Sequence, residues 1–88
     1  MKPIVLYDMT RIITRRMAAT PTGIDRVDIR YAVELLHSDQ VEVAFLRQDG
    51  SKLVLLDKQS SEDFLICMNT RWTQGSSDPA PVPPADAE

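Results

Sequence analysis

The sequence predicts an α/β fold that begins with one strand–helix–strand unit. Three stretches support this fold class: an apolar run at residues 3–9, apolar residues at helical spacing over residues 24–36, and a second apolar run at residues 41–46. In that order they predict a βαβ unit, in which the helix makes a right-handed crossover between two parallel strands.

The first predicted strand is apolar without interruption from Ile4 to Leu6. This pattern is typical of a strand that is buried on both faces of a sheet. Asp8 stands at the carboxyl end of the strand, where open α/β sheets bind their ligands. There its carboxylate could act as a base, orient an acceptor, cap the next turn or pair with an arginine.

The predicted helix follows the turn Pro21-Thr22-Gly23. Thr22 and Asp25 stand three residues apart, which predicts a capping box at the start of the helix. Ser38 and Asp39 end the run of helical spacing.

Apolar residues cover a wide arc of this helix. One stripe, which we expect to face the core, consists of Ile24, Val27, Tyr31 and Leu35. A second group, on a different side of the helix from the stripe, consists of Ile29, Val33 and Leu36. Because one small sheet cannot cover both sides of a helix, we expect the second group to form an exposed patch. The arc therefore predicts either self-association or a missing partner domain.

The remaining sequence predicts a hairpin, a further strand and a tail. A turn at residues 48–51 joins the second strand to residues 53–56, and residues 64–68 form another apolar run of strand length. From residue 73 onward the chain is rich in Pro, Gly and Ser and carries only acidic charges, which favours disorder. We thus expect a folded domain at residues 1–72 and a disordered Pro-rich, acidic tail at residues 73–88.

Composition argues against several functional classes. A net charge of -3 and a pI near 5.0 argue against a nucleic-acid-binding protein, which would carry a basic surface. The single cysteine, Cys67, excludes an intrachain disulfide and fits a reducing cytosol, so we expect a cytoplasmic location. The apolar run near the N-terminus is too short for a secretory signal, and no run is long enough for a transmembrane segment.

The candidate binding site is the loop between the first strand and the helix. This loop contains Arg11, and the helix that follows offers free amides and a partial positive charge, a combination that suits a phosphate or diphosphate. A solvated basic loop is the alternative explanation. The predicted substrate-binding residues are Arg15, Arg16, Thr22, Gly23 and Arg26.

Several of these residues also have a purely structural explanation. Gly23 either lets a ligand approach the backbone or simply suits the turn. Arg26 lies on the polar arc of the helix, where it either reaches a ligand or is merely exposed. Asp28 lies inside the apolar stripe, so we expect it to accept hydrogen bonds from the first loop or to pair with Arg11, Arg15 or Arg16, with a catalytic role as the alternative.

The sequence predicts no catalytic residue, no metal ligand and no cofactor. His37 stands at the end of the helix, where a histidine interacts with free carbonyls, and Cys67 in an apolar run is expected to be a buried small hydrophobe. Trp72 either anchors the last strand or is exposed. There is no cluster of Cys and His, and no glycine-rich phosphate-binding motif is present.

The loop and helix together resemble the N-terminus of bacterial GT-B glycosyltransferases of the group 1 type. The resemblance rests on Asp8-Met9-Thr10-Arg11, the pair Arg15-Arg16 and the segment Pro21–Val27, and it covers roughly residues 3–56. The segment Gly23–Val27 looks like a variant of that family's Gly-Ile-Gly-Arg-Tyr turn.

The resemblance implies a partial Rossmann-like domain on the acceptor side of a transferase. Such an enzyme moves a sugar from a nucleotide-sugar donor to a glycan or lipid-linked acceptor, as in polysaccharide biosynthesis, with no bound metal expected. In that family a second domain holds most of the donor, so we expect this chain to be inactive alone. The ligands implied are a nucleotide sugar or a phosphorylated acceptor. The alternative is a small non-catalytic module that binds a phosphorylated ligand or a partner protein.

Overall fold

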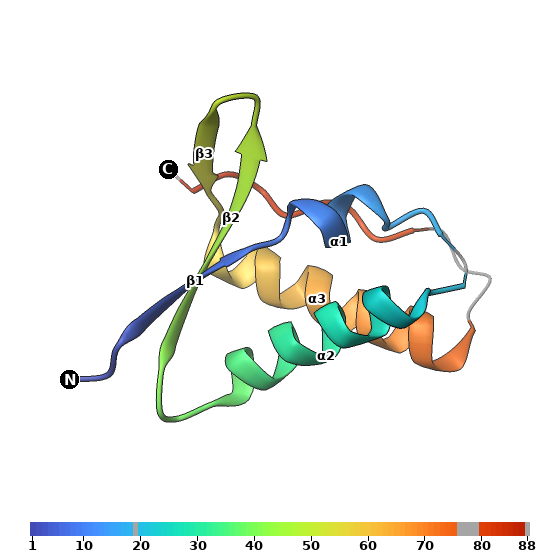
Figure 1. The fold of residues 1–88 in the computed structure, drawn as a ribbon, viewed down its shortest axis with the longest axis horizontal. Coiled ribbons are helices and arrows are strands. Elements are labelled where there is room, and N and C mark those ends of the chain that lie inside the picture. The colour runs from blue at the N-terminus through green and yellow to red at the C-terminus, as the bar shows by residue number, and fades with distance from the viewer. Residues whose placement is uncertain (19, 76–79, 88) are drawn as a thin grey trace.

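The computed structural model describes residues 1–18, 20–75 and 80–87. Its elements, in chain order, are β1 (Ile4–Asp8), α1 (Thr10–Thr14), α2 (Gly23–His37), β2 (Glu42–Asp49), β3 (Lys52–Leu55) and α3 (Lys58–Gln74). The strands form one sheet in the order β1-β2-β3, in which β1 and β2 are parallel and β2 and β3 are antiparallel (Figure 1). The predicted α/β class, the βαβ unit and the hairpin are therefore confirmed, and the arrangement is compatible with a partial Rossmann-like unit.

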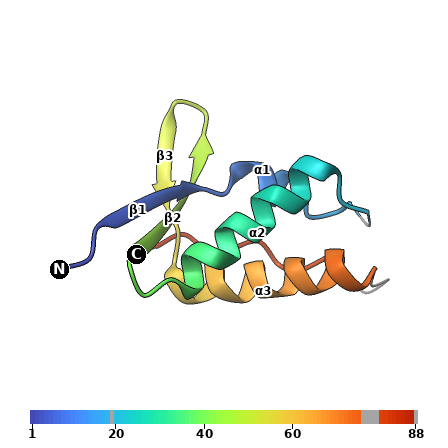
Figure 2. The same cartoon turned by 60° about the horizontal axis from the view of Figure 1, so that its bottom comes forward.

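Within the described residues, helices cover only one face of the sheet. Figure 2 shows α2 and α3 side by side beneath the sheet. The opposite face carries exposed apolar side chains from both outer strands, namely Ile4, Leu6, Leu53 and Leu55. The prediction that the first strand is buried on both faces is wrong, because Ile4 and Leu6 point away from the helical layer and are about two-thirds exposed, at 65% and 66%.

The start of α2 matches the predicted capping box. The Thr22 hydroxyl accepts a hydrogen bond from the amide of Asp25, and the Asp25 carboxylate accepts one from the amide of Thr22. Ser38 follows the last helical residue with extended backbone angles, as expected for the end of the helix.

The buried face of α2 is not the predicted one. Ile29 and Ala32 are buried against the core, whereas Ile24, Val27 and Tyr31 are more than half exposed. The predicted exposed patch of Ile29, Val33 and Leu36 is therefore wrong, since Val33 and Leu36 pack against the core cluster. The reason is α3, a second helix that covers this side of α2.

The apolar run at residues 64–68 belongs to a helix and not to a strand. The Asp57 carboxylate caps this helix by accepting a hydrogen bond from the Ser60 amide at 2.9 Å, and Gly75 ends it in the left-handed conformation at φ 64°. The side chains that it buries recur at helical spacing and are Phe64, Leu65, Met68 and Trp72. The short apolar run alone predicts a strand, and this prediction is wrong. The helix extends beyond the run on both sides through mostly polar residues, so its helical spacing is not visible within residues 64–68.

The described residues after α3 are ordered against the sheet, whereas the sequence predicts disorder from residue 73 onward; residues 76–79 and 88 of that predicted tail lie outside the described residues. Helix α3 extends past residue 72 to Gln74, and residues 80–87 return to the sheet in an extended form. The Ala87 amide donates to the Leu55 carbonyl, and the Asp57 amide donates to the Ala85 carbonyl, each at 2.8 Å. Arg47 pairs with Asp86 at 3.0 Å. Most of these contacts are backbone hydrogen bonds, which do not depend on apolar side chains. The segment at residues 80–87 can therefore make them although it contains few apolar residues.

Candidate functional site

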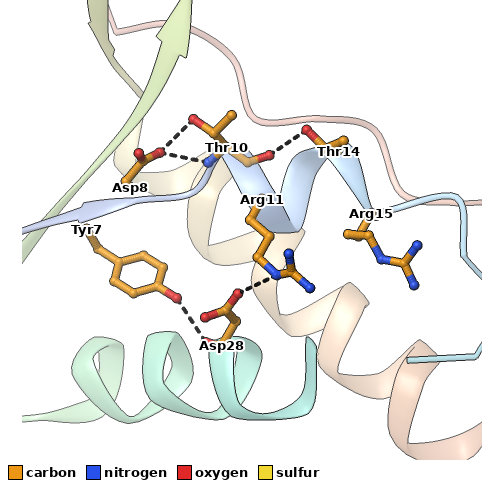
Figure 3. Close-up of a pocket in the computed structure, with 7 residues that line it drawn as sticks. All are labelled: Tyr7, Asp8, Thr10, Arg11, Thr14, Arg15 and Asp28. Carbon is orange, nitrogen blue, oxygen red and sulfur yellow. Dashed lines mark hydrogen bonds and ion pairs between the residues drawn. The ribbon is translucent and has the colours of Figure 1, made fainter. Parts of the chain in front are cut away.

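A cleft of about 600 Å³ opens where the carboxyl end of β1 meets α1 and the first turns of α2. Figure 3 shows Tyr7, Arg11 and Asp28 turned toward one another inside it. The full lining consists of Tyr7, Asp8, Thr10, Arg11, Thr14, Arg15 and Asp28. The cleft therefore lies at the edge of the sheet where α/β proteins bind ligands.

Asp8 caps the turn into α1, which is one of the four roles open to it from the sequence. Its Oδ1 atom accepts hydrogen bonds from the Thr10 amide at 2.9 Å and from the Thr10 hydroxyl at 2.6 Å. The same hydroxyl accepts a hydrogen bond from the Gln48 amide at 2.7 Å. Thr10 therefore joins the ends of β1 and β2 and fixes the floor of the cleft.

Asp25 is the buried charge behind the cleft, with 1% of its surface exposed. Its carboxylate accepts hydrogen bonds from Nε and Nη2 of Arg15 at 3.1 and 3.0 Å and from the Thr22 amide at 2.9 Å. Arg11 Nη2 reaches its other oxygen at 3.4 Å. Burial alone would raise the pKa of this carboxyl, but hydrogen bonds from Thr22 and Arg15 and the charge of Arg15 outweigh burial and hold the pKa below its usual value.

Arg11 bridges two carboxylates. Its Nε atom lies 3.2 Å from Oδ2 of Asp28, in addition to its contact with Asp25. The expectation that Asp28 pairs with a loop arginine is therefore confirmed. Because Asp28 keeps 29% of its side chain exposed and Arg11 keeps 47%, both retain surface on the cleft for a ligand.

Tyr7 closes the strand side of the cleft. Its hydroxyl donates a hydrogen bond to the Asp28 carbonyl at 3.1 Å, and its ring lies against Tyr31 with centroids 5.9 Å apart. Burial, and then the negative charge of Asp28, raise the pKa of Tyr7 to about 12. The phenol therefore remains a neutral hydrogen-bond donor throughout the physiological range.

We expect this pKa to be visible in an ultraviolet titration. Tyr31→Phe leaves Tyr7 as the only tyrosine, and its phenol should then be half ionised close to pH 12 while the chain stays folded. Circular dichroism recorded at each pH reports whether the fold persists. Ionisation of the folded variant near pH 10, the ordinary value, would show that Tyr7 is neither desolvated nor close to Asp28.

The structure brings only two of the five predicted binding residues together, since Arg15 and the Thr22 amide both donate to the Asp25 carboxylate. Of the five, only Arg15 lines the cleft. Arg16 donates to the Ile13 carbonyl at 2.9 Å, and Thr22 is engaged in the capping box. Arg26 lies in a second groove, between α2 and α3. Gly23 is the exposed first residue of α2, and a Cβ atom there would meet nothing within 4 Å.

The N-terminus of α2 already holds an anion, namely the Asp25 carboxylate. It accepts hydrogen bonds from the Thr22 amide and the Arg15 guanidinium, which belong to two of the predicted binding residues. The cleft and the carboxylate behind it contain two arginines, Arg11 and Arg15, against three carboxylates, Asp8, Asp25 and Asp28. The charges of the lining itself balance, and the buried Asp25 behind it adds a negative charge, so the cleft has no net positive charge to favour a diphosphate over a neutral ligand.

Tyr7, Thr10 and Thr14 are lining residues that were not identified from the sequence. Thr14 donates its hydroxyl to the Thr10 carbonyl at 2.8 Å and is exposed. A signal was available for the two threonines, because Thr10 and Thr14 stand four residues apart on the same side of a short helix as the loop arginines. No sequence signal distinguishes Tyr7 from any other apolar strand residue.

The remaining candidate residues lie away from the cleft. His37 is exposed at the end of α2, and Trp72 is buried on α3, where its indole donates to the Ala18 carbonyl at 3.0 Å. Cys67 is exposed, so the prediction of a buried cysteine is wrong for the same reason as the predicted strand. Among the described residues, no group of three or more His, Cys, Asp or Glu side chains is arranged to hold a metal ion.

Within the same described ranges, no helix has the length and apolar character needed to cross a membrane.

Comparisons with protein-family models, with curated proteins and with solved structures give no match to this chain. The geometry of the cleft and the resemblance of the loop and helix therefore form the basis for a functional proposal.

Proposed function

We propose that this chain forms the acceptor-side, N-terminal part of a GT-B-type glycosyltransferase, and that the cleft at the end of β1 holds a neutral, hydroxyl-rich portion of the acceptor. The enzyme to which it contributes transfers a sugar from a nucleotide-sugar donor to a glycan. The observation that carries the proposal is the lining of the cleft, where paired arginines and carboxylates stand beside threonine hydroxyls at a sheet edge suited to ligands.

The lining suits a saccharide because it presents both donors and acceptors of hydrogen bonds. A sugar hydroxyl can donate to Asp28 and accept from Arg11 at the same time, since the two side chains lie 3.2 Å apart and both are partly exposed. Thr14 adds a hydroxyl at the rim, and the ring of Tyr7 adds an apolar surface. A phosphate would instead meet the carboxylates of Asp8 and Asp28, which offset the charges of Arg11 and Arg15.

The donor half of the reaction is not assigned to this chain. The resemblance implies that a second domain binds most of the nucleotide sugar, so the chain alone is expected to show neither sugar transfer nor donor hydrolysis. A non-catalytic module that binds a partner protein is the second candidate, and the exposed apolar side chains of the sheet and of α2 favour it.

Binding of neutral saccharides tests the proposal. Saturation-transfer NMR with a panel of neutral mono- and disaccharides should detect millimolar binding of at least one of them. Thr14→Val keeps the shape of the side chain but removes its hydroxyl, and it should weaken that binding about 2- to 10-fold, the value of one hydrogen bond. Thr70→Val, at an exposed position on α3, is the matched control and should leave binding unchanged.

Two outcomes would count against the proposal. If no neutral saccharide binds while a partner protein is captured with Thr14→Val having no effect, the module is favoured. If both valine variants weaken binding equally, the cleft is not the binding site.

A further inference from the structure

The C-terminal segment at residues 80–87 lies against the fold as an extended chain. Figure 1 shows it running back from the end of α3 to the sheet, where it ends beside β3. The residues that hold it come from β2, from β3 and from the start of α3. We name them the tail seat, which consists of Arg47, Leu55, Asp57 and Ser60.

The tail seat binds the main chain of the segment at three points. The Leu55 carbonyl accepts a hydrogen bond from the Ala87 amide, and the Asp57 amide donates to the Ala85 carbonyl, each at 2.8 Å. The Ser60 hydroxyl accepts from the Ala85 amide at 2.9 Å. None of these bonds uses a side chain of the segment. This is the way in which the edge of a sheet binds an extended peptide.

The tail seat also contacts one side chain of the segment, the Asp86 carboxylate. Nη2 of Arg47 donates to both carboxylate oxygens, at 3.0 and 3.2 Å, and Nε donates to Oδ1 at 3.3 Å. A guanidinium fork of this kind matches the planar geometry of a carboxylate. The residues on either side of Asp86 are alanines, which add no further polar contact of their side chains. The tail seat therefore selects an extended segment that carries a carboxylate between small residues.

The segment is held weakly compared with the rest of the fold. Pro84 is its one buried residue, and Val82 is 83% exposed. The sheet itself does not depend on the segment, since β1 pairs with β2 and β2 pairs with β3. Terminal segments with few buried apolar contacts open at a small cost in free energy while the core stays folded. The segment can therefore leave the tail seat without unfolding of the domain.

We propose that the tail seat is a peptide-binding site, which is occupied here by the C-terminal segment of the chain itself. Once this segment is released, the tail seat binds an extended acidic segment of a partner protein, through the same backbone groups and the same contact with Arg47. The tethered segment competes with the partner because its effective concentration is in the millimolar range. The site shares no residue with the cleft at the end of β1, so the inference does not rest on the proposed saccharide binding.

Hydrogen exchange of the parent chain tests whether the segment is released locally. The amides of Asp57, Ala85 and Ala87 bond across the contact, whereas the Leu56 amide donates to the Phe45 carbonyl within the sheet. The protection factors of the first three amides should be at least about 10-fold lower than that of Leu56. Equal protection would overturn the proposal, because the segment would then leave only when the whole domain unfolds.

A peptide titration tests binding from outside the chain. The variant Asp86→Ala/Ala87→Pro removes the ion pair with Arg47 and the donor to Leu55, both at exposed positions of the segment. The probe is an acetylated and amidated peptide with the sequence of residues 80–87. It should shift the ¹⁵N amide resonances of residues 55–60 of the variant and saturate at millimolar concentration. In the parent chain its binding should be at least about 10-fold weaker, because the tethered segment competes. No saturable shift in the variant would overturn the proposal.

A second peptide, with asparagine in place of the aspartate, tests the selection of a carboxylate. It should bind this variant about 2- to 10-fold more weakly than the first peptide. Adding Arg47→Gln should abolish the difference between the two peptides. Adding Arg30→Gln, at an exposed position on α2, is the matched control and should preserve the difference. Equal binding of the two peptides in the presence of Arg47 would exclude an acidic partner segment.

Discussion

Asp25→Ala is expected to lower the free energy of unfolding by about 2–4 kcal/mol, the largest effect among single polar substitutions in this chain. The substitution removes the carboxylate that accepts a hydrogen bond from the Thr22 amide, which is one half of the capping box, and the charge that Arg11 and Arg15 share. The backbone amide of residue 25 can still donate to the Thr22 hydroxyl. The loss of unfolding free energy stays within this range because both arginines are partly exposed, so water can hydrate their guanidinium groups once the carboxylate is removed. A small domain has only about 5–15 kcal/mol to lose, so the variant should be partly unfolded at ordinary temperature.

Urea denaturation followed by circular dichroism measures this effect. Asp28→Ala is the matched control on the same helix, because its carboxylate makes an ion pair with Arg11 alone and is partly exposed. Its loss should stay below about 1 kcal/mol. Equal losses in the two variants would mean that Asp25 is not the buried anion of the loop.

The effect of Asp25 should also depend on pH with a defined sign. Its pKa is lowered in the folded chain, so its contribution is fully present above the unfolded value of about 3.9 and is lost as the pH falls through the folded value. The difference between the parent and Asp25→Ala should therefore shrink as the pH falls below about 4. A difference that grows toward acid would contradict the lowered pKa.

Leu65→Ala is expected to lower the free energy of unfolding by about 2–5 kcal/mol, because it leaves a cavity at a fully buried position of α3. Ile66→Ala, one residue later, should cost less than about 1 kcal/mol, since Ile66 is half exposed at 50%. The same denaturation experiment compares the two variants.

The pattern of further substitutions along α3 separates a helix from the strand expected from the sequence. In the helix, Met68→Ala is as costly as Leu65→Ala, whereas a strand with Leu65 inside would place Met68 on the opposite face. A cost for Ile66→Ala that equals the cost for Leu65→Ala would contradict the helix.

The local features of the fold could be predicted from the sequence because nearby residues determine them. The capping box depends on Thr22 and Asp25 alone, and the hairpin turn depends on Gly50, whose φ is 63°. The orientation of α2 could not be predicted, because both of its sides are apolar and only the position of α3 decides which one is buried. Residues 58–74 were not recognised as a helix, so the choice of face on α2 was also wrong.

The cleft lies beside the loop from which the sequence predicts binding, but only one predicted binding residue, Arg15, lines it. Its position at the end of the first strand follows from the order of strand, loop and helix. The distribution of charge follows from side-chain contacts that spacing does not reveal. Asp25 was recognised as a cap, but its capture of Arg15 depends on the path of the loop through α1. That contact is one reason why we propose a neutral saccharide and not an anion as the ligand.

The most direct measurement of the ligand class is a pair of titrations of the ¹⁵N-labelled chain, one with a neutral saccharide found in the binding panel and one with pyrophosphate. With the saccharide, we expect the amide resonances of residues 8–15, which surround the cleft, to shift and saturate. With pyrophosphate, we expect no saturable shift at residues 22–26, because Asp25 already occupies that helix end. Saturable pyrophosphate shifts at residues 22–26, with none from any saccharide at residues 8–15, would contradict the proposed acceptor cleft.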